Sequence, residues 1–225
     1  MVRSCRGFAT LHSVPDPSSD ITLEDGPEGL ELRRPCDRPG QGVHAAFEGV
    51  STRGHPFLKL LHGCDGPVID ATAGLGGDTG VLAALGWQVL AIEREPRLFK
   101  LLQEAHARIQ SSVLRERISL LKGDAIEILP SLPEAFRSPA AIILDPMYPP
   151  RRKSSALPSK GMQALRLLHG QDVSSTAESL LQAALAASPS RVILKRPPEA
   201  SSMTSRPPTF SVGSKLVRWD AWQIG

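Results

Sequence analysis

From residue 67 onward, short apolar runs alternate with stretches that have the periodicity of helices. The apolar runs are PVIDATAG, WQVLAIERE, ISLLKGD, AAIILD and RVILK. The helical patterns are DTGVLAALG, the stretch from Pro96 to about Ile109, AIEILPSL and TAESLLQAALAA. Strands that alternate with helices and are nearly all apolar predict an α/β fold, with a mostly parallel sheet covered by helices on both faces. FSV and KLVRWDAWQ near the end predict a closing antiparallel hairpin.

The first 65 residues differ in composition, because they are rich in glycine, proline and charged residues. Apolar alternation occurs only at Leu30 and Leu32 and again at Val43, Ala45 and Phe47. This pattern predicts one or two small hairpins rather than a second core. We therefore expect an N-terminal hairpin appendage over residues 1–65 and the main domain over residues 66–225. The stretch after the fourth apolar run is expected to be a polar loop.

Composition excludes a membrane span, because no stretch approaches the ~18 apolar residues that one needs. Cys5, Cys36 and Cys64 are odd in number and widely spaced, so they support neither a disulfide framework nor a zinc site. We expect a cytoplasmic protein. The first fifteen residues contain Arg3 and Arg6 but no acid, so an organelle transit peptide is the alternative to a simple frayed terminus.

Ligands of such sheets bind where the parallel strands end, near the point at which strand order reverses. Gly74, Gly76 and Gly77 lie between the first strand and its helix, where glycine permits positive φ and close approach of a ligand. Glu93 ends the second strand, and a carboxylate there can accept both hydroxyl hydrogens of an adenosine ribose. Together they indicate NAD or S-adenosylmethionine, although the glycines alone could form a plain turn.

Acidic residues beside the glycines distinguish the two cofactors. Asp70 ends the strand and Asp78 follows the glycines, where an acid would repel a pyrophosphate but attract a sulfonium and an ammonium. We therefore favour S-adenosylmethionine. Asp124 and Ala125, after the third strand, are expected to flank the adenine, with the Asp124 carboxylate accepting from its exocyclic amine. Asp124 could equally be a helix N-cap.

The stretch DPMYP follows the fourth strand and resembles the (Asn/Asp)-Pro-Pro-(Tyr/Phe) motif of methyltransferases that modify exocyclic amines of bases. The Asp145 carboxylate and the Pro146 carbonyl would accept the two amine hydrogens and aim the nitrogen lone pair at the methyl group. Tyr148 would stack on the base. No metal is required, because the amine becomes acidic once it is methylated. The alternative is a proline-rich loop without chemistry.

Cations follow this stretch at once and recur after the fifth strand. They are Arg151, Arg152, Lys153, Lys195 and Arg196. A formal charge of +3 is too small to argue for a nucleic-acid partner by itself, and a charge run is usually a solvated face. Their position beside the substrate motif would put them on the same rim and favours contacts with RNA phosphates, around a base that has left its stack.

Longer stretches extend the resemblance over roughly residues 22 to 222. They are LEDGPEGLELR, DATAGLGGDTGVLAALG, IERE with its following proline, LDPMYP followed by RRKSSAL, LLHGQD, VILKRP and KLVRWDAW. Together they resemble the RsmJ family, the bacterial small-subunit (16S) rRNA guanine-N2 methyltransferases. The resemblance implies a class I (Rossmann-like) methyltransferase fold, S-adenosylmethionine as cofactor, and small-subunit rRNA or an assembling small subunit as partner. The cofactor contacts that it implies are Gly77, Asp78, Glu93, Arg94, Asp124, Ala125 and Asp145.

The sequence departs from that family at four places. Gly77 stands where the family usually has the arginine of GLGRD, and STRG replaces a longer basic segment but keeps Arg53. Pro158, Ser159 and Lys160 stand where the family has two lysines, with Gly161 in place of an acid, and the N-terminus is shorter. The cofactor residues are barely touched by these changes. The RNA surface is thinner, so the methylated nucleotide stays open.

Three functions are compatible with these patterns to different degrees. A guanine-N2 methyltransferase uses every motif. An NAD-dependent dehydrogenase would use the glycine turn and Glu93 but would leave DPMYP without a role. A ribosome-assembly factor that binds RNA without transferring methyl groups would fit the thinner basic surface, whereas the intact Glu93, Asp145 and Tyr148 argue for an enzyme.

Overall fold

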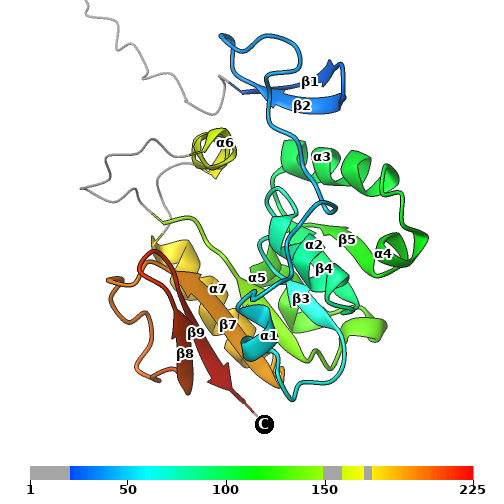
Figure 1. The fold of residues 1–225 in the computed structure, drawn as a ribbon. Coiled ribbons are helices and arrows are strands. Elements are labelled where there is room, and N and C mark those ends of the chain that lie inside the picture. Colours follow the sequence, from blue (N-terminus) through cyan, green and yellow to red (C-terminus); the bar gives the residue numbers. More distant parts are fainter. Residues whose placement is uncertain (1–20, 149–158, 170–173, 225) are drawn as a thin grey trace, which may run out of the picture.

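The computed structural model describes residues 21–148, 159–169 and 174–224. Its centre is a seven-stranded sheet with the order β5-β4-β3-β6-β7-β9-β8 (Figure 1). The strands of this sheet are β3 (Val68–Asp70), β4 (Val89–Glu93), β5 (Ile118–Lys122), β6 (Ala141–Leu144), β7 (Arg191–Arg196), β8 (Phe210–Gly213) and β9 (Arg218–Gln223). The helices are α1 (Phe57–Leu60), α2 (Gly77–Ala84), α3 (Pro96–Ala107), α4 (Ser112–Glu116), α5 (Ala125–Ile128), α6 (Lys160–His169) and α7 (Ser174–Ala186), with the short 3₁₀ turns η2 (Leu129–Ser131) and η3 (Glu134–Phe136).

Strands β3 to β7 are parallel, and the predicted closing hairpin adds β9 antiparallel to β7 and β8 antiparallel to β9. β3 is flanked by β4 on one side and β6 on the other, so the order of connection reverses at β3. In open α/β sheets, ligands bind beyond the carboxyl ends of the strands at such a reversal. The α/β fold predicted from the alternation is therefore confirmed, and the loops after β3 and β6 become the place to look for a site.

Buried apolar residues divide between the two faces of the sheet, because successive residues of a strand point to opposite sides. Ile143 of β6 and Ile193 of β7 belong to the cluster that includes residues of α2 and α3. Their neighbours Ile142 and Val192 belong to the second cluster, together with residues of α5 and α7. A buried apolar run therefore reflects a strand that is covered on both faces.

The N-terminal segment shares the first of these two clusters. Ile21, Leu32, Phe47 and Phe57 are all buried in it with residues of α2 and α3. Between residues 21 and 65, the part of the segment that the structure describes, only one hairpin forms, from β1 (Thr22–Gly26) and β2 (Gly29–Arg33). The second apolar alternation contributes a single bridge, between Leu32 and Val43. The segment therefore extends the core that the main domain already has.

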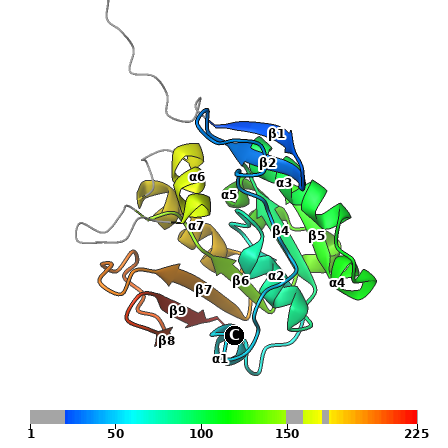
Figure 2. The ribbon, with the colours of Figure 1, turned by 45° about the horizontal axis from the view of Figure 1, so that its top comes forward.

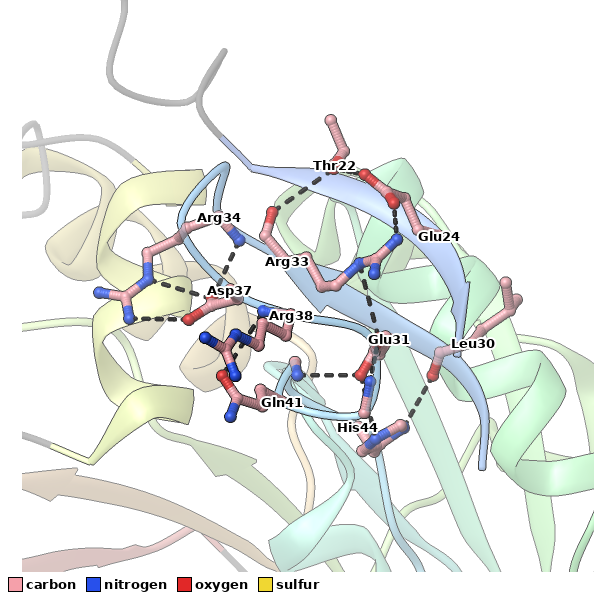
Figure 3. Close-up of polar contacts among 12 residues, drawn as sticks. Thr22, Glu24, Leu30, Glu31, Arg33, Arg34, Asp37, Arg38, Gln41 and His44 are labelled. Carbon is pink, nitrogen blue, oxygen red and sulfur yellow. Dashed lines mark hydrogen bonds and ion pairs between the residues drawn. The ribbon is translucent and has the colours of Figure 1, made fainter. Parts of the chain in front are cut away.

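Glu31 of β2 is completely buried and organises the loop that follows the hairpin (Figure 3). Its carboxylate accepts the main-chain N–H groups of Gly40 and Gly42, both at 2.9 Å. The side chains of Arg33 and His44 lie 3.5 Å and 3.7 Å from it. A buried carboxylate is tolerated when its oxygens are hydrogen-bonded and paired. Glu31 thus fixes the path of the chain that leaves β2, through its bonds to Gly40 and Gly42.

The stretch after residue 158, expected to be a polar loop, contains helix α6 instead. Its pattern is KGMQALRLLH, with Ala164 and Leu168 buried four residues apart. Figure 2 shows α6 between the β1–β2 hairpin and α7. The short helices α1 and α4 were also not predicted; the latter begins at an N-cap, Ser111, whose hydroxyl accepts the N–H of Leu114. Within the described ranges, no helix is long and apolar enough to span a membrane.

Candidate active site

The loop after β3 is held by the buried carboxylate of Asp70, which is 2% exposed. Asp70 accepts the hydroxyl of Thr79 in α2 at 2.6 Å and the main-chain N–H of Thr72 at 3.2 Å. Burial raises the pKa of Asp70 to about 7, against the opposing effect of these hydrogen bonds. Asp70 therefore joins the end of β3 to the helix that follows the glycine turn.

The glycine turn needs glycine at some positions and not at others. Gly74 and Gly76 have φ of 55° and 84°, in the left-handed region. A Cβ on Gly76 would lie 2.8 Å from the ring of Phe47, which the N-terminal segment packs against the turn. Gly77 has an ordinary φ, and a Cβ there would meet nothing within 4 Å in the part of the chain that is described. Position 77 therefore has room for a side chain.

Glu93 at the end of β4 reaches back to the glycine turn. One of its oxygens accepts the main-chain N–H of Gly74 at 2.9 Å, and the other accepts that of Glu95 at 2.8 Å. The residue is 4% exposed, and burial raises its pKa while these hydrogen bonds oppose the rise. A carboxylate has about four acceptor positions, so Glu93 keeps acceptor capacity beside these main-chain bonds. The structure thus gives Glu93 a role in shaping the turn that the sequence did not predict.

Asp124 is the N-cap of α5, accepting the N–H of Ile126 at 2.9 Å. Its second oxygen lies 3.3 Å from the guanidinium of Arg94, which is 44% exposed. Ala125 is buried directly after it. Capping therefore leaves Asp124 partly accessible beside Arg94, and the two functions considered for it are compatible.

The Asp145 loop is tied to the loop after β3. The main-chain N–H of Asp145 donates to the hydroxyl oxygen of Thr72 at 2.7 Å. Pro146 and Tyr148 follow at intermediate exposure, and the Tyr148 hydroxyl lies 3.7 Å from the sulfur of Met203. Burial raises the pKa of Tyr148 to about 12, so its hydroxyl stays protonated at neutral pH. Thr72 was not singled out from the sequence, although its place two residues after a strand-end acid is a typical turn position.

Lys195 lies among carboxylates. Its ammonium is 2.6 Å from Asp145 and 3.2 Å from Asp78, so it joins the DPMYP stretch to the first turn of α2. The expectation that Lys195 and Arg196 share one rim is wrong, because neighbouring residues of a strand point to opposite faces. Arg196 is 3% exposed and pairs with Asp220 at 3.3 Å. It is therefore not placed to contact RNA. Arg151, Arg152 and Lys153 lie outside the described residues.

Helix α6 covers the glycine turn. A Cβ on Gly161 would lie 2.9 Å from a methyl group of Leu75, and a Cβ on Gly74 would lie 3.7 Å from a methyl group of Leu165. The loop after β2 holds this helix, because Arg34 donates to Gln163 at 3.2 Å. Lys160 similarly donates to the Gln41 carbonyl at 2.9 Å. The glycine turn is thus enclosed by two segments, α6 and residues 44–50.

Comparison with known proteins agrees with this geometry. The model of the SAM-dependent methyltransferase family matches residues 56–224. The ribosomal RNA small subunit methyltransferase J of Tolumonas auensis is 39% identical, over 92% of this chain and 87% of its own length. The chain belongs to this methyltransferase family.

Two further relatives match most of the length of this chain. The ribosomal RNA small subunit methyltransferase J of Aeromonas hydrophila is 42% identical, over 86% of this chain and 82% of its own length. The crystal structure of a SAM-dependent methyltransferase from Neisseria gonorrhoeae has a TM-score of 0.67 at 28% identity, covering 87% of this chain and 79% of that one. The family resemblance deduced from the motifs is thereby confirmed, as is the class I methyltransferase fold.

The residues present fit the family's cofactor, S-adenosylmethionine. Asp78 and Asp145 together with Lys195, which pairs with both, carry one net negative charge at the carboxyl ends of the central strands, where a sulfonium and an ammonium would be stabilised. Glu93 keeps acceptor capacity next to Gly74. A pyrophosphate-containing cofactor would instead meet the carboxylate of Asp78 in the first turn of α2. The choice of S-adenosylmethionine over NAD follows from these charges as well as from the family.

Proposed function

We propose that this protein transfers a methyl group from S-adenosylmethionine to the exocyclic N2 amine of a guanine in small-subunit ribosomal RNA. One observation carries the chemistry: the Asp145 loop is anchored through Thr72 to the loop that enters the glycine turn. The names of the relatives support the class of RNA. The choice of guanine N2 rests on the resemblance of the motifs and on the chemistry of an amine held by a carboxylate.

The cofactor half of the proposal uses residues at the ends of β3, β4 and β5. We assign the ribose to Glu93 and the adenine surroundings to Arg94, Asp124 and Ala125. The methionine end is assigned to Asp78 and Asp145, beside Gly74, Gly76 and Gly77. When bound, S-adenosylmethionine supplies an electrophilic methyl group. Asp145 therefore faces both the cofactor and the amine that is methylated.

The substrate half assigns one task to each residue of the motif. The Asp145 carboxylate and the Pro146 carbonyl accept the two hydrogens of the amine, which holds its lone pair in line with the bond to be broken. Asp145 can also take the proton that nitrogen loses after methylation, since the methylated amine is acidic. Tyr148 stacks on the base after it leaves the helix. We assign phosphate contacts to Arg151, Arg152 and Lys153. We assign none to Lys195, which pairs with two acids, or to Arg196, which is buried.

The decisive experiment identifies the methylated nucleoside. The protein is incubated with labelled S-adenosylmethionine and with either free 16S-type rRNA or unmodified small subunits, and the RNA is digested. We expect label in N2-methylguanosine. A substrate with inosine at the target, which lacks the amine, should accept no methyl group, and labelled inosine would refute the assignment of the amine. Binding of rRNA and cofactor without any labelled nucleoside would favour the assembly-factor function.

Variants of the motif separate catalysis from binding. Asp145→Ala should abolish methyl transfer while RNA affinity changes little, because that affinity depends mainly on phosphate contacts. Tyr148→Ala should lose about 1 to 3 kcal/mol of base stacking, whereas Tyr148→Phe keeps the ring and should keep most of the activity. Wild-type turnover by Asp145→Ala would contradict the mechanism.

A further inference from the structure

Lys195 occupies a position between two acids that come from different parts of the fold. It extends from β7, while Asp145 follows β6 and Asp78 lies in the first turn of α2. The ammonium donates to Asp145 Oδ2 at 2.6 Å and to Asp78 Oδ2 at 3.2 Å. The two acids therefore share one cation.

An aromatic wall holds the ammonium in this position. The ring of Trp219 lies 5.0 Å from Lys195 Nζ, and the two residues are register partners across β7 and β9. The ring of His55 meets Trp219 edge-on at 6.5 Å, and its Nδ1 accepts the N–H of Phe57 at 3.3 Å. A cation over an indole face is attracted by the ring, and the packing restricts where it can move. Lys195 is therefore preorganised rather than freely rotating.

The charges around Lys195 keep it protonated. Burial lowers the pKa of Lys195, but Asp145 and Asp78 more than reverse this effect, so the net change is upward. Burial raises the pKa of Asp145, Lys195 lowers it, and the like charge of Asp78 raises it again. The ammonium is thus the main opposing influence on an acid that would otherwise hold its proton more tightly.

The pairing also distinguishes the two oxygens of Asp145. Oδ2 is occupied by Lys195, and the main-chain N–H of the same residue is fixed by Thr72. Among the residues that the structure describes, none donates a hydrogen bond to Oδ1. A protonated Asp145 could donate from that oxygen and would repel an amine hydrogen, whereas an ionised one accepts it.

We propose that Lys195 is a positioning residue for methyl transfer: it holds Asp145 ionised and turned so that Oδ1 accepts a hydrogen of the substrate amine. This inference rests on the proposed function for the identity of the amine. The pairing of Lys195 with Asp145 is a property of the free protein and can be measured without substrate.

Several titratable groups face this pair and must be separated from it. They are Asp70 at the end of β3, Asp78 in α2, His55 in the N-terminal segment and Tyr148 after β6. None of them is changed in the variants below, so a difference from the wild-type protein reports the loss of the ammonium. Lys195→Met removes the charge at similar length, Lys195→Arg keeps it, and Lys100→Met removes an exposed lysine on α3 as a control.

The first measurement is the titration of the Asp145 carboxyl carbon by ¹³C NMR in the cofactor-free protein, assigned by comparison with Asp145→Asn. In Lys195→Met the midpoint should move to higher pH, and in Lys195→Arg and Lys100→Met it should stay near that of the wild-type protein. An unchanged midpoint in Lys195→Met would overturn the proposal. Because no RNA is present, this result stands whether or not the proposed substrate is right.

The second measurement is the single-turnover rate of methyl transfer against pH. Removing an opposite charge next to a carboxylate raises its pKa by about one unit or more. The single-turnover rate of Lys195→Met should therefore fall about tenfold or more at low pH and recover in part at high pH. Lys195→Arg should keep the shape of the wild-type profile. An equal loss at every pH would assign Lys195 a purely structural role and overturn the proposal. If Lys195→Met does not fold, Lys195→Gln takes its place in both measurements.

Discussion

The hydroxyl oxygen of Thr72 accepts the main-chain N–H of Asp145 at 2.7 Å. The two residues are 73 positions apart in the chain but follow neighbouring strands, β3 and β6, whose register brings Asp70 opposite Ile143. The loop that carries the proposed acceptor is therefore fixed to the loop that enters the glycine turn. This side-chain oxygen helps to set the position of Asp145 relative to the residues that we assign to the cofactor.

Replacing Thr72 by valine keeps the shape of the side chain and removes this acceptor. The unpaired N–H should lower the free energy of unfolding by about 1 to 3 kcal/mol. The displacement of Asp145 should slow single-turnover methyl transfer by about tenfold or more. Affinity for S-adenosylhomocysteine, measured by calorimetry, should change much less. Thr72→Ser keeps the hydroxyl and is the matched control. A valine variant as fast as the serine variant would show that this bond does not position Asp145.

Asp70 should make the stability of the protein fall as pH rises from about 4 to about 7. Its pKa is about 7 in the folded protein against 3.8 for an ordinary aspartate, so in this interval the folded chain holds a proton that the unfolded chain has released. At 1.36 kcal/mol per unit, the contribution lost over the whole interval is on the order of 4 kcal/mol. Urea unfolding at several pH values measures it.

Asp70→Asn is the test of that dependence, because the amide imitates the protonated carboxyl. As pH rises through this interval, the unfolding free energy of the variant should increase relative to that of the wild-type protein. Using the difference cancels the histidines, whose lowered pKa values act in the opposite direction. A difference that is independent of pH would mean that Asp70 is ionised throughout.

The sheet could be predicted from the sequence because its strands are buried on both faces and read as apolar runs. Helix α6 was missed because its apolar residues include the exposed Met162 and because it follows a proline-rich stretch. The N-terminal segment was harder still. Phe47 packs against Gly76, nearly thirty positions later in the sequence, and no local sequence pattern predicts such a contact.

The site residues at strand ends could be proposed because topology brings the carboxyl ends of parallel strands together. Their partners could not. Thr72 and Thr79 look like ordinary turn and helix residues, and the pairing of Lys195 with both Asp78 and Asp145 depends on which face of β7 each side chain occupies. Because successive residues of a strand point to opposite faces, Lys195 and Arg196 could have been placed on opposite faces of β7 from the sequence.

Gly76 and Gly77 should respond very differently to substitution. Gly76→Ala forces a left-handed φ on alanine and a Cβ 2.8 Å from the Phe47 ring, so we expect a loss of about 2 kcal/mol or more of unfolding free energy. Gly77→Arg should stay within about 1 kcal/mol, because better helix propensity offsets a cation at a helix N-terminus. Equal losses in urea unfolding would mean that position 77 is more crowded than the structure indicates.

Arg196→Met should lower stability without changing the salt dependence of RNA binding. The guanidinium pairs with Asp220 inside the protein, where breaking an ion pair costs about 3 to 5 kcal/mol, less here because Arg218 also pairs with Asp220. Alanine at Arg151, Arg152 and Lys153 together should instead leave stability alone and lower the slope of log K against log salt by roughly 0.7 to 0.9 per lost contact. If Arg196→Met lowered the salt dependence of RNA binding and left stability unchanged, Arg196 would be an RNA-contacting residue after all.

Glu93→Gln should weaken the binding of S-adenosylhomocysteine by an amount that its effect on stability cannot explain. The carboxylate accepts the N–H groups of Gly74 and Glu95, so glutamine, with one acceptor oxygen, loses one of these bonds and also the charge offered to the ribose hydroxyls. Loss of a charged acceptor costs about 1.5 to 3 kcal/mol, which corresponds to a 10- to 150-fold rise in the dissociation constant measured by calorimetry. Glu127→Gln, on the exposed side of α5, is the control for removing a carboxylate near the same edge. If affinity is unchanged while the urea midpoint falls, Glu93 shapes the glycine turn and does not contact the cofactor.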